Sequence, residues 1–477
     1  MSRPICVRMP PSPTGLFHVG TVRTMLFNWL FARRNGGRVV LRFEDTDVAR
    51  STEEAVTHAE AVLRWLGIDW DDGPYRQTER YHLYAAAAEE LIAQGAAYRC
   101  YCTEDELKAD RAQRQAEGRP LVYSGRCRAR SAAEREALAA QGLPSVVRLA
   151  LPQTGTTVIE DVVHGTIEWE NALQGDHVIL RSDGSPTYQF ANPFDDIQMG
   201  VTHVIRGEDL MPSTPRQLAL YRALGAPEPT FAHLPMVLGP DKRKLSKRHG
   251  AISVEEFVDA GVIADALVNY LALVGWSYDD HTTYMTRAEL VERFTLERVT
   301  KSPGVFDPEK LEWLNGEHLR ALPAAEFAAA LQAYLEHVGS ALAGRPDRVA
   351  EAAPLVHEKM RVLGQFERLA AFLFGPPEPD PAAWERVRAD ERAPASLRAA
   401  RDGLAAVTDW RAEAIEAALH AACEREGTKP RVLFMPIRVA LTGSTVSPGL
   451  YESLELVGRD ESLRRIDAAL AALSTGS

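Results

Sequence analysis

Two loops of this 477-residue chain carry residue types that suit phosphate chemistry. The first, residues 8–21, is rich in proline and glycine and places Thr14 and His18 just before a helical pattern of apolar residues. A helix N-terminus presents unpaired N–H groups, and these side chains would add donors for a phosphate. The second loop, residues 242–250, gathers lysine and arginine in a short segment. Each loop alone also fits a simpler interpretation, a turn for the first and a solvated basic loop for the second.

The two loops together are far more specific than either one. The pair resembles the two ATP-binding motifs of class I aminoacyl-tRNA synthetases: Pro-Ser-Pro-Thr-Gly-x-x-His-Val-Gly and Lys-Leu-Ser-Lys-Arg. The residues within both motifs are most similar to those of the glutamyl-tRNA synthetases. The resemblance runs from Arg8 to about Gly443 and covers nearly the whole chain. Val19 and Thr21 stand where the family often has isoleucine and histidine, and Pro10 stands where it commonly has alanine.

The resemblance implies that the chain activates an amino acid with ATP, accompanied by Mg²⁺, and transfers it to tRNA. The substrate carboxylate attacks the α-phosphate, so no protein nucleophile is needed, and positioning and charge stabilisation supply most of the acceleration. By resemblance, Lys244 and Lys247 act on the phosphates together with His18. The positions that match the family's ATP contacts are Thr14, His18, Gly20, Glu208, Asp209 and Lys247.

A glutamate substrate presents two carboxylates and one ammonium group. Arginine forks onto a carboxylate with a geometry that lysine cannot copy. The resemblance places Arg8 and Arg206 at substrate-contacting positions and Glu44 at the position that receives the ammonium. The other matching pocket residues are Ser12, Tyr188 and Asn192. For each residue alone a surface ion pair or a strand-end charge is the simpler interpretation, but their joint order favours the functional one.

The cysteines indicate a metal site rather than disulfide bonds. The chain has five, an odd and sparse set for its length. Three of them fall in one short segment: Cys100, Cys102 and Cys127. Structural Zn²⁺ takes four ligands, and no histidine lies between His82 and His164 to be the fourth. Tyr123 fits the pattern Tyr-x-x-x-Cys of some relatives. The alternative is three free thiols without a metal.

The elements that must position these residues begin with two short apolar strands, residues 5–7 and 39–41, joined by a helix. A ligand loop after the first strand indicates a doubly wound sheet. A further helix is expected after Ser51 or Thr52, and residues 178–181 and 204–206 are expected to return to a parallel sheet. The predicted fold is an α/β Rossmann-like catalytic domain with an α+β insertion, followed by an all-α anticodon-binding region.

Composition shifts divide the chain. The expected parts are residues 1–99 and 186–304 for the catalytic domain, the latter with the basic loop, 100–185 for an insertion, and 305–375 and 376–477 for two helical subdomains. The resemblance implies that the insertion contacts the tRNA acceptor end, that 186–304 includes a stem-contact region, and that the helical subdomains bind the anticodon. A proline-rich breaker, residues 375–381, separates the last two. Lys359 and Arg361 sit near the family position that senses the anticodon, although a lysine or arginine on a helix surface is more often simply solvated.

The overall composition sets few limits. The formal net charge of −12 does not suggest nucleic-acid binding, although a local basic face can coexist with it. No apolar run is long enough to span a bilayer, and Pro4 and Pro10 stand where a signal peptide needs an apolar run, so the cytoplasm is expected. The expected partners are glutamate tRNA and L-glutamate, with a monomeric enzyme. Two alternatives stay open, an enzyme that also charges glutamine tRNA and an inert tRNA-binding protein.

Overall fold

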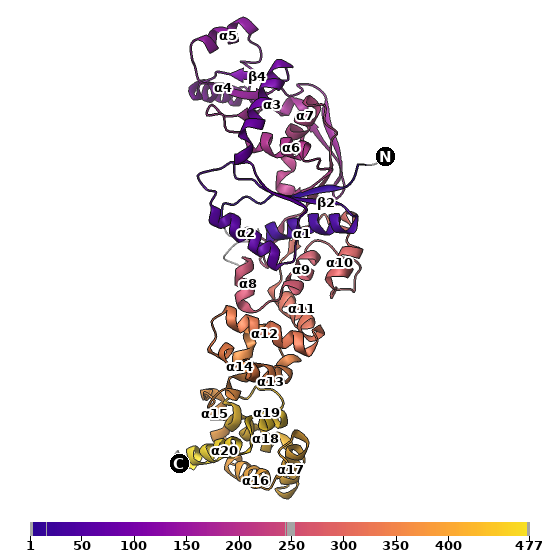
Figure 1. The fold of residues 1–477 in the computed structure, drawn as a ribbon. Coiled ribbons are helices and arrows are strands. Elements are labelled where there is room, and N and C mark those ends of the chain that lie inside the picture. Colours follow the sequence, from indigo (N-terminus) through magenta and orange to yellow (C-terminus); the bar gives the residue numbers. More distant parts are fainter. Residues whose placement is uncertain (1–2, 16, 244, 246–252, 475–477) are drawn as a thin grey trace. The chain divides into compact units, whose positions relative to one another are not determined.

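The computed structural model describes residues 3–15, 17–243, 245 and 253–474. The chain forms two compact units (Figure 1). The first unit comprises Met1–Glu256 and Leu267–Pro308, and the second comprises Phe257–Ala266 and Glu309–Ser477. Among the described residues, no helix is long and apolar enough to cross a membrane.

The first unit begins with the predicted strand–helix–strand arrangement. Strands β1 (Cys6–Met9), β2 (Arg38–Phe43) and β3 (Asp72–Arg76) pair in parallel in the order β1-β2-β3. Helix α1 (Val19–Arg34) connects the first two strands. Helix α2 (Glu53–Trp65) starts where the sequence predicts, because the Thr52 side chain accepts a hydrogen bond from the Ala55 N–H.

A second sheet continues from the free edge of β1. It has the order β7-β6-β10-β9, and its members are β6 (Thr156–Asp161), β7 (Gly165–Glu170), β9 (His203–Gly207) and β10 (Thr230–Leu234). The Thr202 N–H donates to the Cys6 carbonyl at 2.9 Å, which holds the start of β9 beside β1. Strand β9 pairs in parallel with β10, as predicted for residues 204–206. The strand order therefore reverses between β1 and β9, because the chain proceeds from β1 to β2 and β3 on one side and from β9 to β10 on the other.

The prediction that residues 178–181 return to a parallel sheet is wrong. Strand β8 (Val178–Leu180) pairs antiparallel with β5 (Val146–Leu149), which pairs antiparallel with β4 (Ala97–Cys100). A short apolar run is compatible with both a parallel and an antiparallel strand, so the sequence pattern does not predict which strand it pairs with. The helices around these sheets are α3 (Tyr81–Ala93), α4 (Glu104–Ala116), α5 (Ala132–Ala140), α6 (Tyr188–Gln198) and α7 (Thr214–Ala223). The remaining elements of this unit include β11 (Val237–Leu238), α10 (Arg287–Arg293) and β12 (Gly304–Val305). Helix α8 (Val254–Ala260) begins in this unit and continues into the second.

The second unit is helical and has two hydrophobic cores. The first core gathers buried side chains such as Phe327, Leu331 and Val356. Its helices are α11 (Pro308–Ala321), α12 (Ala324–His337), α13 (Pro346–His357) and α14 (Phe366–Ala370). The second core gathers residues such as Leu404, Leu419 and Ile466. Its helices are α16 (Ala393–Ala405), α17 (Ala412–Arg425), α18 (Pro430–Thr442), α19 (Leu450–Val457) and α20 (Arg459–Ser474), with α15 (Pro381–Arg388) beside α18. The predicted breaker lies between the two cores.

Candidate active site

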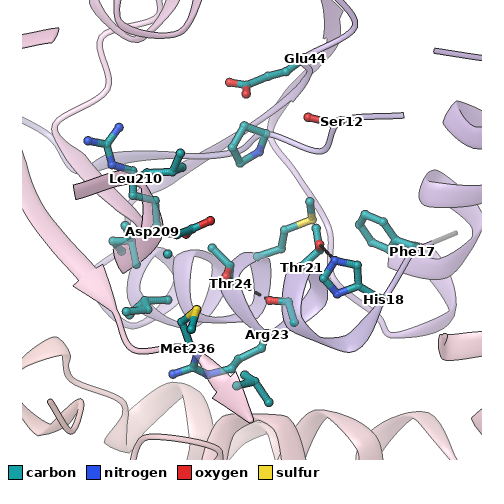
Figure 2. Close-up of a pocket in the computed structure, with 18 of the residues that line it drawn as sticks. Ser12, Phe17, His18, Thr21, Arg23, Thr24, Glu44, Asp209, Leu210 and Met236 are labelled. Carbon is teal, nitrogen blue, oxygen red and sulfur yellow. Dashed lines mark hydrogen bonds between the residues drawn. The ribbon is translucent and has the colours of Figure 1, made fainter. Parts of the chain in front are cut away.

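A cavity of about 690 Å³ opens at the carboxyl ends of β1 and β9 (Figure 2). This is the point where the strand order reverses, the usual ligand position in open α/β sheets. In Figure 2, Glu44 and Ser12 lie at the top of the view and Arg23 and Met236 at the bottom. The structure brings most of the predicted site residues to its wall: Arg8, Ser12, Thr14, His18, Gly20, Glu44, Tyr188, Arg206 and Asp209. Asn192 and Glu208 do not line it.

The phosphate loop and α1 meet at His18. This residue is the N-cap of α1 and has extended backbone angles, and its Nε2 lies 3.1 Å from the Thr21 hydroxyl (Figure 2). A Cβ at Gly20 would lie 3.2 Å from two atoms of the His18 ring. Glycine at this position therefore leaves room for the ring at the start of the helix, where backbone N–H groups face a ligand.

Glu44 is held by groups behind the cavity wall. Its Oε1 accepts hydrogen bonds from the Arg42 guanidinium, at 3.2 Å, and from the Asn192 amide. Burial raises the pKa of Glu44, and the nearby charges of Arg42 and Arg8 oppose that effect. Asn192 is 1% exposed, so its contact with the ligand space is through Glu44.

Arg8 belongs to a buried ion network that sequence reasoning missed. Its Nε lies 3.2 Å from Asp196, which also lies 2.8 Å from the Arg42 guanidinium. All three side chains are at most 2% exposed. The two arginines hold the pKa of Asp196 below its usual value, although burial by itself would raise it. The available signal was one arginine in the otherwise apolar segment 39–43 and two adjacent aspartates in the mostly apolar segment 190–197.

Arg206 has a different environment from Arg8. Its Nε donates to His233 Nε2 at 3.1 Å, and its two terminal nitrogens donate to Gln217 at 2.6 Å and Thr214 at 2.9 Å. All three acceptors are uncharged side-chain atoms, and within the described parts of the chain no carboxylate lies within 4 Å of this guanidinium. Burial lowers the pKa of Arg206. Burial, followed by the Glu44 charge, raises the pKa of the neighbouring Tyr188 to about 12.

The two acidic residues after β9 separate. Asp209 reaches the cavity, and a Cβ at Gly207 would lie 2.5 Å from its Oδ1, so glycine makes room for it. The Glu208 carboxylate instead accepts the Met236 N–H at 2.9 Å. Lys244 and Lys247 lie outside the described residues. The cavity wall also includes Arg23 and several apolar residues that the sequence did not single out, such as Phe17, Leu210 and Met236.

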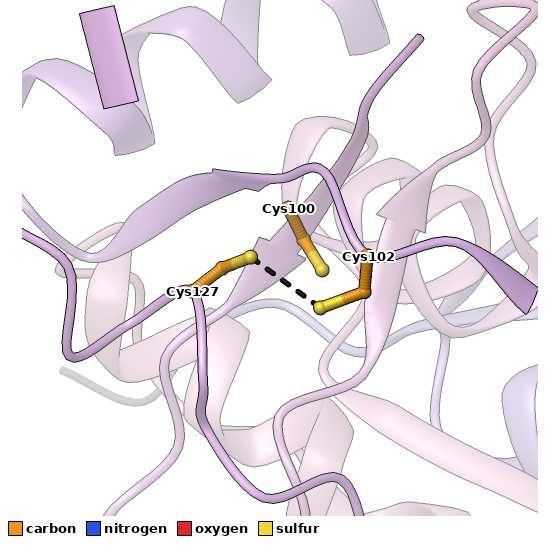
Figure 3. Close-up of side chains that lie close together, drawn as sticks. All are labelled: Cys100, Cys102 and Cys127. Atoms are coloured by element: carbon orange, nitrogen blue, oxygen red, sulfur yellow. Dashed lines mark hydrogen bonds between the residues drawn. The ribbon is translucent and has the colours of Figure 1, made fainter. Parts of the chain in front are cut away.

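The three cysteines meet in the first unit as predicted (Figure 3). Their sulfur atoms all lie within 4.8 Å of one another, with Cys102 and Cys127 3.5 Å apart. The Tyr123 hydroxyl lies 3.5 Å from the Cys100 sulfur and 3.6 Å from that of Cys102. Zinc bound 2.3 Å from each thiolate separates the sulfurs by about 3.8 Å, so this donor set fits a tetrahedral ion.

Lys359 and Arg361 lie in the turn after α13, not on a helix. The Lys359 ammonium donates to the Ser447 carbonyl at 3.0 Å, so this lysine is not simply solvated. The Arg361 backbone N–H donates to the Gln365 side chain. The Lys359 contact joins this turn to the segment before α19, whereas the Arg361 contact stays within the part of the chain that forms the first core.

Comparison with known proteins agrees with this architecture. The family described as tRNA synthetases class I (E and Q), catalytic domain, matches residues 4–313, and an anticodon binding domain matches residues 326–470. The glutamate–tRNA ligase of Thermodesulfovibrio yellowstonii is 44% identical over 96% of this chain and 98% of its own length. This chain belongs to the glutamate–tRNA ligases of class I.

Further relatives span the chain equally well. The glutamate–tRNA ligase of Syntrophobacter fumaroxidans is 44% identical over 98% of both chains. The crystal structure of a glutamate tRNA ligase from Elizabethkingia meningosepticum, in complex with its amino acid, is 29% identical and has a TM-score of 0.88 over 99% of this chain and all of that one. The predicted family and fold class are confirmed: a parallel Rossmann-like region with antiparallel strands inserted, followed by a helical anticodon-binding region.

Proposed function

We propose that this chain ligates L-glutamate to the 3′ end of glutamate tRNA for translation, through a glutamyl-adenylate. The observation that carries the proposal is the charge on the cavity wall. Arg8 and Arg206 offer two buried guanidinium groups, and Glu44 offers one carboxylate whose side chain is 8% exposed. This set complements a substrate with two carboxylates and one ammonium. Tyr188 and Ser12 complete the wall, and Asn192 acts by holding Glu44.

ATP would occupy the part of the cavity next to α1. Thr14, His18 and Gly20 meet there with the free N–H groups of the helix start, and Asp209 faces the same space. Mg²⁺ bound with the nucleotide would offset part of the phosphate charge. We assign Lys244 and Lys247 the role of stabilising the triphosphate as pyrophosphate departs, because ammonium groups offset the negative charge that develops on the leaving phosphates. Glu208 supports the site through the Met236 backbone rather than by contact with ATP.

We further propose that Cys100, Cys102, Cys127 and Tyr123 hold one structural Zn²⁺. Such an ion would fix the end of β4 to the loop that carries Cys127. Thiolate and phenolate ligands and a closed, largely buried set suit a structural rather than a catalytic zinc.

The regions around the site would engage tRNA. We assign residues 100–185 to the acceptor end, 186–304 to completion of the catalytic domain and the stem, and the helical parts 305–375 and 376–477 to the anticodon, with Lys359 and Arg361 near its third base. We propose a monomer that works in the cytoplasm.

Charging of purified glutamate tRNA and glutamine tRNA, assayed separately with labelled glutamate and ATP, tests the function. Product on glutamate tRNA alone supports a discriminating enzyme. Product on both supports the non-discriminating alternative, in which a later amidation must correct the glutamine tRNA. Product on neither, with folded protein, refutes the proposal and favours an inert tRNA-binding protein.

A further inference from the structure

A buried histidine and aspartate stand directly behind Arg206. His233 on β10 and Asp161 at the end of β6 are both fully buried, and neither lines the cavity. The Asp161 Oδ2 lies 2.7 Å from His233 Nδ1, and His233 Nε2 lies 3.1 Å from the Arg206 Nε. The three groups therefore form a chain from carboxylate through imidazole to guanidinium.

The hydrogen-bond directions in this chain are fixed by chemistry. The Asp161 carboxylate is already surrounded by donors, since Oδ1 accepts the Val163 and His164 N–H groups and Oδ2 accepts the His233 N–H at 3.1 Å. Nδ1 of His233 must therefore carry the proton that points at Oδ2. Arginine is always a donor, so the Nε2 that faces Arg206 must be the bare acceptor. Only the neutral Nδ1–H tautomer satisfies both ends.

This arrangement orients Arg206 without cancelling its charge. Arg8 makes a direct buried ion pair with Asp196, whereas Arg206 reaches Asp161 only through an uncharged ring. Its three donated bonds use three of the five N–H groups of a guanidinium, one on each nitrogen, and leave one on each terminal nitrogen. A carboxylate placed directly against Arg206 would compete with a substrate carboxylate for the same charge.

We infer that Asp161 and His233 are positioning residues that hold Arg206 ready for a substrate carboxylate by setting the tautomer of the imidazole between them. The inference rests on the proposed function, because it takes Arg206 as a glutamate contact. The inference adds two residues to the site, Asp161 and His233, which lie 72 positions apart in the sequence. Both would affect glutamate binding only through the orientation of Arg206.

Two substitutions at one position separate this role from mere packing. In H233N the side-chain amide nitrogen takes the place of Nδ1 and can still donate to Asp161, but the shorter side chain has no atom at the place of Nε2 to accept from Arg206. In H233Q the amide oxygen reaches the place of Nε2 and can accept from Arg206. We expect H233N to raise the KM for glutamate about ten- to a hundredfold with the KM for ATP within twofold, and H233Q to recover most of that loss. Activity is read as pyrophosphate exchange with tRNA present.

Two further variants keep the outcomes distinguishable. D161N should behave as H233N, because an amide cannot accept from all four donors. D176N is the control, since Asp176 is also a buried carboxylate, which accepts from the Tyr98 hydroxyl, the Arg128 guanidinium and the Leu151 N–H, but it does not line the cavity. Its glutamate KM should stay at the wild-type value. A folded H233N with a wild-type glutamate KM, or equal losses in H233N and H233Q, overturns the inference.

R206A distinguishes failure of the inference from failure of the proposed function. An unchanged glutamate KM in R206A would remove Arg206 from the substrate site and refute that part of the proposed function. A raised KM in R206A together with a normal KM in H233N would overturn the positioning role alone. Nitrogen NMR of histidine-labelled wild-type protein tests the tautomer without any variant: a proton on Nδ1 only is expected for His233, and a proton on Nε2 overturns the inference.

Discussion

Replacing Asp196 with asparagine should destabilise the first unit, because it removes the one negative charge that Arg8 and Arg42 share. The two contacts measure 3.2 and 2.8 Å, and the three side chains are almost completely buried. At an effective dielectric constant of about 20, two charges about 4 Å apart attract by about 4 kcal/mol, and desolvation offsets much of this.

The net cost follows from what remains after the change. Arg42 keeps Glu44 at 3.2 Å and Asp195 at 3.8 Å. Among the residues that the structure describes, Arg8 keeps only its hydrogen bond to the Ile205 carbonyl. Removing one member of a buried ion pair typically costs about 3–5 kcal/mol, and the asparagine oxygen can still accept one bond. We therefore expect a loss near the lower end, about 3 kcal/mol.

Hydrogen exchange followed by mass spectrometry measures this loss where it occurs. In peptides that cover β1 and β2, a loss of about 3 kcal/mol corresponds to roughly a hundredfold drop in protection. D47N is the control, since Asp47 pairs with Arg50 at the surface and both are well exposed; its change should stay below about 1 kcal/mol, or fivefold. A drop of less than fivefold in β1 for D196N would refute the reasoning.

The stability difference between wild type and D196N should also depend on pH, and the sign of that dependence follows from the pKa of Asp196. The folded-state pKa of Asp196 lies below the ordinary value of 3.8. Its contribution to stability is therefore complete above that value and is lost as the pH falls through the lower folded-state pKa. The difference in unfolding free energy between wild type and D196N should be constant from pH 6 to about pH 4 and should shrink below it. A difference that grows on acidification would contradict the assignment of the charge to Asp196.

The remaining predictions concern substrate contacts and zinc. Lys247→Ala should lower the rate of glutamate activation far more than it weakens glutamate binding, because it removes charge from the departing pyrophosphate; equal losses in both would exclude that role. Arg8→Ala, once shown to fold, should lose glutamate affinity and largely keep ATP affinity in equilibrium binding, and an unchanged glutamate affinity would remove Arg8 from the pocket. Cys127→Ser should lose zinc measured by atomic emission of the purified protein and lower the melting temperature, while Tyr123→Phe should retain zinc less tightly against a chelator. A wild-type protein purified without any zinc would count against the whole site.

Much of the site could be predicted because its chemistry lies in short contiguous segments. The loop around His18 and Gly20 lies in consecutive residues that end in a helix, so the local pattern already places these residues at the helix start that lines the cavity. The segment with Cys100, Cys102 and Cys127 also spans only 28 residues, which limits how far apart the sulfurs can lie. Helix starts such as that at Thr52 could be predicted for the same reason, since capping is a local interaction.

The sheet partners and the support behind the cavity were decided by the tertiary structure. Strand β8 has the same apolar character as a parallel strand, and only its pairing with β5 shows otherwise. Asp196 is 188 positions from Arg8, and Asp161 is 72 positions from His233, so nothing local indicates that either pair meets. The sequence by itself determined the family resemblance, and with it the residues proposed to contact glutamate and ATP, because motifs of residue type and spacing are read directly along the chain. Only the fold decided that Arg8 shares a carboxylate with Arg42 and that Arg206 has none beside it among the described residues, because burial and charge pairing depend on which distant segments pack together.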